Sequence, residues 1–157
     1  GHVRDGLYRE LIMENVDNPF VVAALFTIDR AEHVKKMIKP ALAKGEWVVC
    51  ERYADSTLAY QGYGMGLDKE LINRMNEEAI DGLWPDKIFY LDIEPHLALA
   101  RLQNKEKDAL EGQGLEFLQR VREGYEEIAR TRGYIYMDAT LPPEIIVKRI
   151  LEEVKLQ

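Results

Sequence analysis

Short continuous apolar runs alternate along the chain with segments whose apolar residues recur at helical spacing, and this pattern predicts the fold class. The runs at 47–50, 87–93 and 134–139 are almost wholly apolar, as is typical of strands covered on both faces. Helical segments separate them. Strands that alternate with helices are joined by right-handed crossovers, so the sequence predicts an α/β fold with a parallel sheet.

Capping residues and prolines predict where the helices begin and end. Asn18 and Pro19 begin a helix that Gly45 ends, and Pro40 should kink it or start a new segment. Its first part, FVVAALF, is apolar on nearly every side, so we expect the core on one face and a second subunit on another. The other helices are expected to begin at Asp68, at Pro95, near Gly114 and at Pro142 or Pro143.

Polar side chains follow each predicted strand. Glu51 and Arg52 come directly after the first, and Asp92 and Asp138 lie near the ends of the other two. Ligands of parallel sheets bind beyond the carboxyl ends of the strands, so these residues are candidates for one site. Each carboxylate could instead cap a helix or only solubilise a strand end.

The stretch from 52 to 61 combines a cation with hydroxyls and an aromatic ring. Arg52 could bind a phosphate through its guanidinium fork, or it could pair with Glu51 or Asp55. A second group could line a heterocyclic base, or its hydroxyls could only satisfy amides at a helix start. This group is Ser56, Thr57, Tyr60 and Gln61.

Phe26 and Arg30 are four residues apart on the long predicted helix and therefore share a face. Such a pair suits a base, because the ring can stack on it while the arginine donates to a carbonyl. The alternative for Phe26 is an ordinary core position. The polar segment 104–114 could be a plain connector or a lid that closes over a ligand and excludes water.

Composition limits the class of partner. The chain has 157 residues and a formal net charge of −7, which suits one domain and argues against nucleic-acid or anionic-membrane binding. No apolar run approaches the ~20 residues of a membrane span, so a cytoplasmic protein is expected. The single cysteine, Cys50, excludes an internal disulfide and is expected to be a buried structural thiol.

Five segments, in order and at matching spacing, resemble the bacterial-type thymidylate kinases. ERYADSTLAYQGYG is similar to the D-R-Y-x-x-S-x-x-A-Y-Q-G signature of that family, and LFTIDRAEHV to its L-F-x-x-x-R-x-x-H element. GYGMGLD, DGLWPDKIFYLDI and LEFLQRVREGYEEIA complete the set. The resemblance covers essentially the whole chain and implies a P-loop nucleoside monophosphate kinase fold, a three-layer sandwich with a parallel sheet.

The resemblance implies transfer of a phosphoryl group from ATP to dTMP, giving dTDP, with Mg²⁺ as cofactor. Arg52 and Glu51 would be catalytic, Arg52 on the dTMP phosphate and Glu51 near magnesium through water. Phe26 would stack on thymine and Arg30 would bond its exocyclic oxygen. The remaining residues implied for dTMP are Ser56, Thr57, Tyr60, Gln61 and Arg9. Those implied for ATP and the lid are Lys105, Lys107, Asp138, Ala139 and Thr140.

The sequence departs from the family at three points. No G-x-x-x-x-G-K-[ST] occurs, although the family uses that loop to hold the ATP phosphates. The chain is therefore expected to be one domain, the C-terminal three-quarters of a thymidylate kinase, without two strands that include the central one, and inactive alone. Glu51 replaces the usual aspartate. Ala109 replaces a lid arginine, and the alternatives for its role are Lys105, Lys107 or an arginine carried by the P-loop.

Two alternatives stay open beside a thymidylate kinase. One is a non-catalytic nucleotide-binding or dimerising module that lacks the P-loop, and the other is a related kinase for another nucleotide. A homodimer is expected in each case, both from the all-round apolar helix and from the family resemblance.

Overall fold

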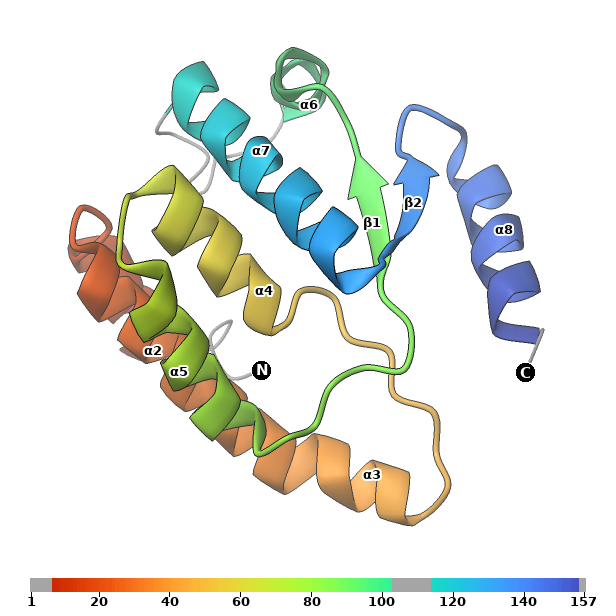
Figure 1. Cartoon of the computed structure of the whole chain (residues 1–157), viewed down its shortest axis with the longest axis horizontal. Helices are drawn as coiled ribbons and strands as arrows, with labels where there is room; N and C mark the ends of the chain where they lie inside the picture. The colour runs from red at the N-terminus through yellow and green to blue at the C-terminus, as the bar shows by residue number, and fades with distance from the viewer. Residues whose placement is uncertain (1–6, 103–113, 156–157) are drawn as a thin grey trace.

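The computed structural model describes residues 7–102 and 114–155, the side chains of 7–9 and 102 excepted. Helices dominate, and a small sheet lies toward the C-terminal side (Figure 1). In chain order the elements are α1 (Leu7–Glu14), α2 (Pro19–His33), η2 (Val34–Ile38), α3 (Lys39–Ala43), α4 (Ala54–Thr57), η3 (Leu58–Gly64), α5 (Lys69–Ile80), β1 (Phe89–Asp92), α6 (Pro95–Leu102), α7 (Leu115–Arg132), β2 (Ile135–Asp138) and α8 (Pro143–Lys155).

The sheet consists of β1 and β2, which pair in parallel from Phe89 with Ile135 to Asp92 with Asp138. Helix α7 lies between β1 and the continuous α4–η3 helix, and α8 runs beside β2 on the other side (Figure 1). The α/β class and the parallel pairing are confirmed. The register places both aspartates at the carboxyl edge of the sheet, as the sequence predicted.

The predicted strand over 47–50 is wrong. Residues 46–50 have no regular secondary structure, and Trp47 and Val49 are 76% and 95% exposed. A strand is held by hydrogen bonds to a neighbour, and in the part of the chain described here the sheet contains β1 and β2 alone. Without a paired neighbour, an apolar run is not sufficient to form a strand.

The long helix after Asn18 is continuous but changes its winding. The Asn18 side chain accepts from the Val21 amide at 3.2 Å, as its predicted role as a cap requires. A π-helical segment, η2, then joins α2 to α3. Pro40 is the second residue of α3, so the predicted start of a new segment at this proline corresponds to a change from π-helical to α-helical winding within one continuous helix.

The core between η3, α5 and α7 depends on two glycines. It contains buried Leu58, Ala59, Ile72, Phe117, Val121 and Ile128. A Cβ at Gly64 would lie 2.6 Å from the Phe117 ring, and one at Gly124 would lie 2.5 Å from Cγ of Tyr63. The two helices therefore approach closely only because neither position carries a side chain.

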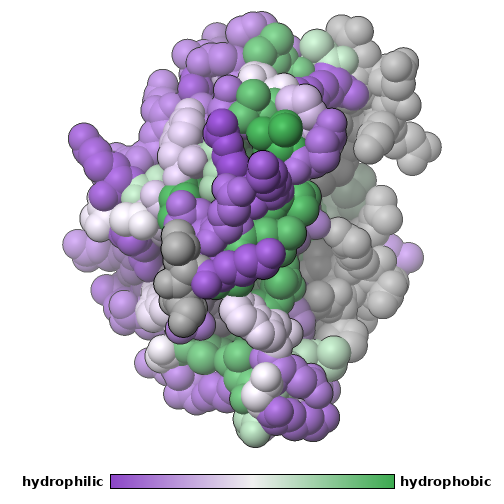
Figure 2. All heavy atoms as spheres, turned by 90° about the vertical axis from the view of Figure 1, so that its right-hand side faces the viewer, coloured by the Kyte–Doolittle hydropathy of each residue, from purple (hydrophilic) through white to green (hydrophobic). Residues whose placement is uncertain are grey.

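Apolar side chains also reach the surface. Between hydrophilic residues, a stripe of apolar ones runs down the side of the molecule on which α8 lies (Figure 2). Ile145, Val147 and Leu151 of α8 are 40%, 53% and 50% exposed. Among the described residues, no helix is both long enough and apolar enough to cross a membrane.

We expect Gly124→Ala to lower the free energy of unfolding by about 1–3 kcal/mol, because the new methyl group overlaps the Tyr63 side chain. This net loss already allows for the gain of about 1 kcal/mol in helix propensity that alanine brings, because the closest atoms are Cβ and Cγ of Tyr63 rather than the far end of its side chain. Urea denaturation measures the effect, and Glu123→Ala, at an exposed position of α7, is the control. Equal unfolding midpoints for wild type and Gly124→Ala would contradict the close packing of α7 on η3.

Candidate functional site

The predicted phosphate-binding residue lies at a sharp turn of the chain. Arg52 has φ +62°, a left-handed conformation that costs a non-glycine residue roughly 1–2 kcal/mol, and such strain is concentrated at functional sites. Its guanidinium lies 4.9 Å from the centre of the Tyr60 ring. Cys50, expected to be buried, is exposed, and its thiol donates to the Arg52 carbonyl at 3.2 Å. The reason is that residues 47–50 do not enter a sheet.

Arg30 is the most buried cation of this region, at 8% exposed. Its Nη1 donates to Oδ1 of Asn76 at 2.7 Å, and its Nη2 to Oγ1 of Thr57 at 2.7 Å and the Tyr53 carbonyl at 3.2 Å. All three acceptors are uncharged, and burial lowers the pKa of Arg30 below its ordinary value. The fold thus fixes a guanidinium in its interior on uncharged hydrogen-bond acceptors, while the carboxylates of Asp29 and Asp55 act on its charge from beyond salt-bridge distance.

An aromatic cluster lies beside Arg52, whose guanidinium is over the Tyr60 ring. Tyr60 packs edge-on against Phe117 and Tyr125, with ring centres 6.1 and 6.3 Å away. The Tyr125 hydroxyl donates to Oγ of Ser56 at 2.7 Å. Phe26 is partly buried one turn before Arg30 on α2. The predicted base-binding residues therefore come from α2, from the end of α4 and from η3.

Gln61 and Glu51 have contrasting environments. Gln61 is 1% exposed in η3, and its amide lies 3.8 Å from Sδ of Met65. The segment has π-helical winding, which is often found at functional sites. Glu51 is exposed on the turn before Arg52, so its carboxylate could meet a ligand or a hydrated cation.

The turn after β2 contains the residues predicted to border adenine. Asp138 accepts from the backbone amide of Thr140 at 2.8 Å and from its hydroxyl at 2.6 Å. The Ala139 amide donates to the Asp92 carbonyl at 2.8 Å, and its carbonyl accepts from Arg101 at 2.9 Å. These bonds fix the turn at the carboxyl edge of the sheet.

Asp92 joins this edge of the sheet to α7. It accepts from Nε and Nη2 of Arg122 at 2.8 and 2.9 Å, from the Tyr90 hydroxyl at 2.8 Å, and from the Tyr136 hydroxyl. The hydrogen bonds from Arg122 lower the pKa of Asp92 from its ordinary 3.8 to about 2. Arg122 also pairs with Glu94 at 2.6 Å.

Some predicted residues lie outside the part of the chain that the structure describes. Lys105, Lys107 and Ala109, with nearly all of the expected lid at 104–114, fall outside the described residues. Arg9 lies on α1, but its side chain is outside the described part as well. Their expected roles remain predictions.

Sequence reasoning missed two residues of the site. Asn76 interrupts the buried stripe of α5 between Ile72 and Ala79, and a polar residue at such a position is a signal that could have been used. Tyr125, which bonds Ser56, gave no comparable signal, since the contact joins residues 69 positions apart.

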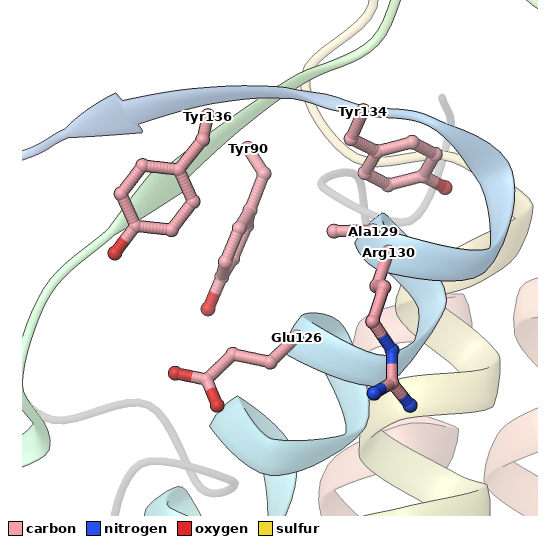
Figure 3. A pocket seen from close by; sticks show the side chains of 6 residues that line it. All are labelled: Tyr90, Glu126, Ala129, Arg130, Tyr134 and Tyr136. Atoms are coloured by element: carbon pink, nitrogen blue, oxygen red, sulfur yellow. The ribbon is translucent and has the colours of Figure 1, made fainter.

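Two surface hollows lie away from these residues. One is lined by Tyr90, Glu126, Ala129, Arg130, Tyr134 and Tyr136, with the three rings gathered beside α7 (Figure 3). The other lies between α2 and α5 and is lined in part by Ile28 and Met75. Neither contains a residue predicted for the site. Among the residues that the structure describes, no cluster of three or more His, Cys, Asp or Glu could hold a metal ion.

Comparison with known proteins gives consistent matches. The sequence model of the thymidylate kinase family matches residues 5–150. A thymidylate kinase of Synechococcus sp. (strain RCC307) is 43% identical over 126 residues, which are 80% of this chain and 59% of that protein. Those of Halothermothrix orenii and Prochlorococcus marinus (strain MIT 9301) are 42% and 39% identical over 83% and 92% of the chain, and 65% and 70% of their own lengths. The chain thus spans less than two thirds of the first of these relatives.

The lowered pKa of Asp92 predicts an acid-sensitive contribution to stability. Because the folded pKa lies below the unfolded value, the network stabilises the native state above about pH 5 and loses this effect as the pH falls through 4 toward 2. The contribution is on the order of 2 kcal/mol. In urea titrations, the difference in unfolding free energy between wild type and Asp92→Asn should therefore shrink over this range.

The control for this experiment is Asp86→Asn, the same change at an exposed position before β1. Its difference from wild type should vary much less over the same pH range. If the Asp92→Asn difference were the same at pH 6 as near pH 2, the proposed role of the Arg122 network in acid stability would be wrong.

Proposed function

Since the chain belongs to the thymidylate kinase family, we propose that its protein transfers a phosphoryl group from ATP to dTMP, giving dTDP. The observation that supports this most is the buried Arg30 guanidinium, held by uncharged acceptors beside Phe26 and the Arg52 turn. A cation held in this way has donors for a carbonyl-bearing base, and an aromatic ring lies one turn away to stack on it. Family membership supports the fold proposal of a P-loop nucleoside monophosphate kinase, a three-layer sandwich.

In the proposed complex, Arg30 donates to the exocyclic oxygen of thymine while Phe26 stacks on the ring. Thr57 already bonds Arg30, which supports a place at the base edge for it and for Ser56. Tyr60 would pack against the deoxyribose. Gln61 and Arg9 complete the proposed acceptor site, Gln61 by fixing the geometry of η3 and Arg9 by reaching toward the phosphate.

Arg52 is proposed to bind the dTMP phosphate. Its guanidinium lies over the Tyr60 ring, and the fork geometry of arginine matches phosphate oxygens. Phosphoryl transfer requires mainly positioning and charge neutralisation from the protein, so a cation at the acceptor phosphate is the contribution expected of this chain. The net charge of −7 is compatible with a small anionic ligand, because binding one requires only a local cluster of cations.

The donor nucleotide is proposed to lie at the carboxyl edge of the sheet. Asp138, Ala139 and Thr140 would border adenine, and Lys105 and Lys107 of the proposed lid would approach the phosphates. Mg²⁺ prefers oxygen ligands and usually binds one or two carboxylates together with substrate phosphates, which the exposed Glu51 fits. Bound with ATP, the ion would neutralise phosphate charge.

A homodimer is proposed on the evidence of the α2–α3 helix. Phe20, Ile28 and Met37 along it are 52%, 53% and 59% exposed, although the helix is apolar on nearly every side. Burial of such side chains against a second copy contributes about 25 cal/mol per Å² of apolar surface. The expectation that FVVAALF is covered by a partner as well as by the core remains a proposal.

The proposed activity is tested by supplying the product of the gene that encodes this chain with ATP, Mg²⁺ and dTMP, and measuring ADP in a coupled assay. Arg52→Ala should lower kcat/KM for dTMP about 10- to 100-fold, since a charge-assisted hydrogen bond contributes roughly 1.5–3 kcal/mol. Arg74→Ala, at an exposed arginine of α5, is the matched control. Absence of ADP formation with dTMP would reject the proposal. Faster turnover of dUMP or CMP than of dTMP would identify that nucleotide as the acceptor instead.

A further inference from the structure

The Asn76 side chain joins three segments inside the molecule. It extends from α5, is 1% exposed, and accepts from Nη1 of Arg30 on α2 at 2.7 Å. Its Nδ2 donates to the carbonyl of Ala54, the first residue of α4, at 2.9 Å. The two partners have opposite polarity, so the amide has one orientation that satisfies both. The reverse would put N–H groups against the guanidinium and two oxygens against each other.

Asn76 also holds Arg30 without neutralising its positive charge. Three of the five N–H groups of the guanidinium have the acceptors Asn76, Thr57 and the Tyr53 carbonyl, and in the described part of the chain two remain for a ligand. A carboxylate at this position would compensate the charge inside a medium of low dielectric, where charges interact strongly. An amide holds the same geometry without that compensation.

We propose that Asn76 is a positioning residue that sets base specificity: it holds Arg30 still without placing a carboxylate on the guanidinium, so that the guanidinium selects a base with a carbonyl over one with an amino group at that edge. This inference rests on the proposed function. A base with an amino group would oppose N–H to N–H and leave buried donors unpaired, which sites built on hydrogen bonds reject strongly. Asn76 acts only through Arg30 and does not touch the substrate.

The test compares Asn76→Asp, Arg30→Gln and the double variant, using kcat and KM for dTMP and for dCMP. The carboxylate of Asn76→Asp would pair with Arg30 and repel the Ala54 carbonyl. We expect KM for dTMP to rise about tenfold or more, with kcat changed less than about threefold. The preference for dTMP over dCMP should fall by about tenfold. A tenfold change corresponds to the loss of one hydrogen bond of moderate strength. Asn73→Asp, the same change on α5 at a partly exposed position, should leave all of these near wild type.

The double variant distinguishes positioning from a general structural effect. If Asn76 acts through Arg30, Asn76→Asp should change KM less than about twofold when Arg30→Gln is already present, because coupled residues are not additive. Additive effects, or an unchanged preference for dTMP over dCMP in Asn76→Asp, would overturn the inference.

Two further results separate failure of the proposed function from failure of the Asn76→Asp variant to fold. A wild-type protein inactive on dTMP rejects the proposed function itself, before any variant is compared. If Asn76→Asp does not melt cooperatively, Asn76→Ser replaces it in the same cycle: its hydroxyl is uncharged but too short to reach both partners. It should raise KM and lower base preference only while Arg30 is present, and an effect that persists in Arg30→Gln overturns the inference.

Discussion

The buried guanidinium of Arg30 is the constraint on which this region depends. Burial of a cation is unfavourable unless it is hydrogen-bonded, and two segments distant from it in sequence supply its acceptors: α5 through Asn76, and the α4 segment through Thr57 and the Tyr53 carbonyl. These bonds therefore do two things at once. They tie α2 and α5 to the start of α4, and they hold donors in a fixed direction where a base is proposed to lie.

Helix α7 supports that arrangement from the other side of the α4–η3 helix (Figure 1). Gly64 and Gly124 let α7 approach η3 closely, which brings Tyr125 within hydrogen-bond distance of Ser56. In the same part of α7, Arg122 holds Asp92 at the carboxyl edge of the sheet. One helix thus contacts both the proposed acceptor side and the strand edge where the donor is proposed to bind.

Local signals predicted the elements well and long-range pairing less well. Asn18, Asp68 and Gly45 mark helix ends by their own backbone and side-chain chemistry, which a sequence displays directly. The strand over 47–50 failed because a strand requires a neighbour, which its own apolarity does not reveal. Motif spacing singled out Arg30, Thr57, Tyr60 and Arg52 as candidates for the site, and the structure places Arg30 and Thr57 in contact. Tyr125 could not be found, since only the fold brings it to Ser56.

The most direct measurement of the central claim is a crystal structure of the protein with dTMP. We predict a thymine carbonyl oxygen within hydrogen-bond distance of the Arg30 guanidinium, the ring against Phe26, and the phosphate at Arg52, with the bond from Arg30 to Asn76 retained. A nucleotide bound elsewhere, or Arg30 rotated away from Asn76 to meet a different ligand group, would contradict the account.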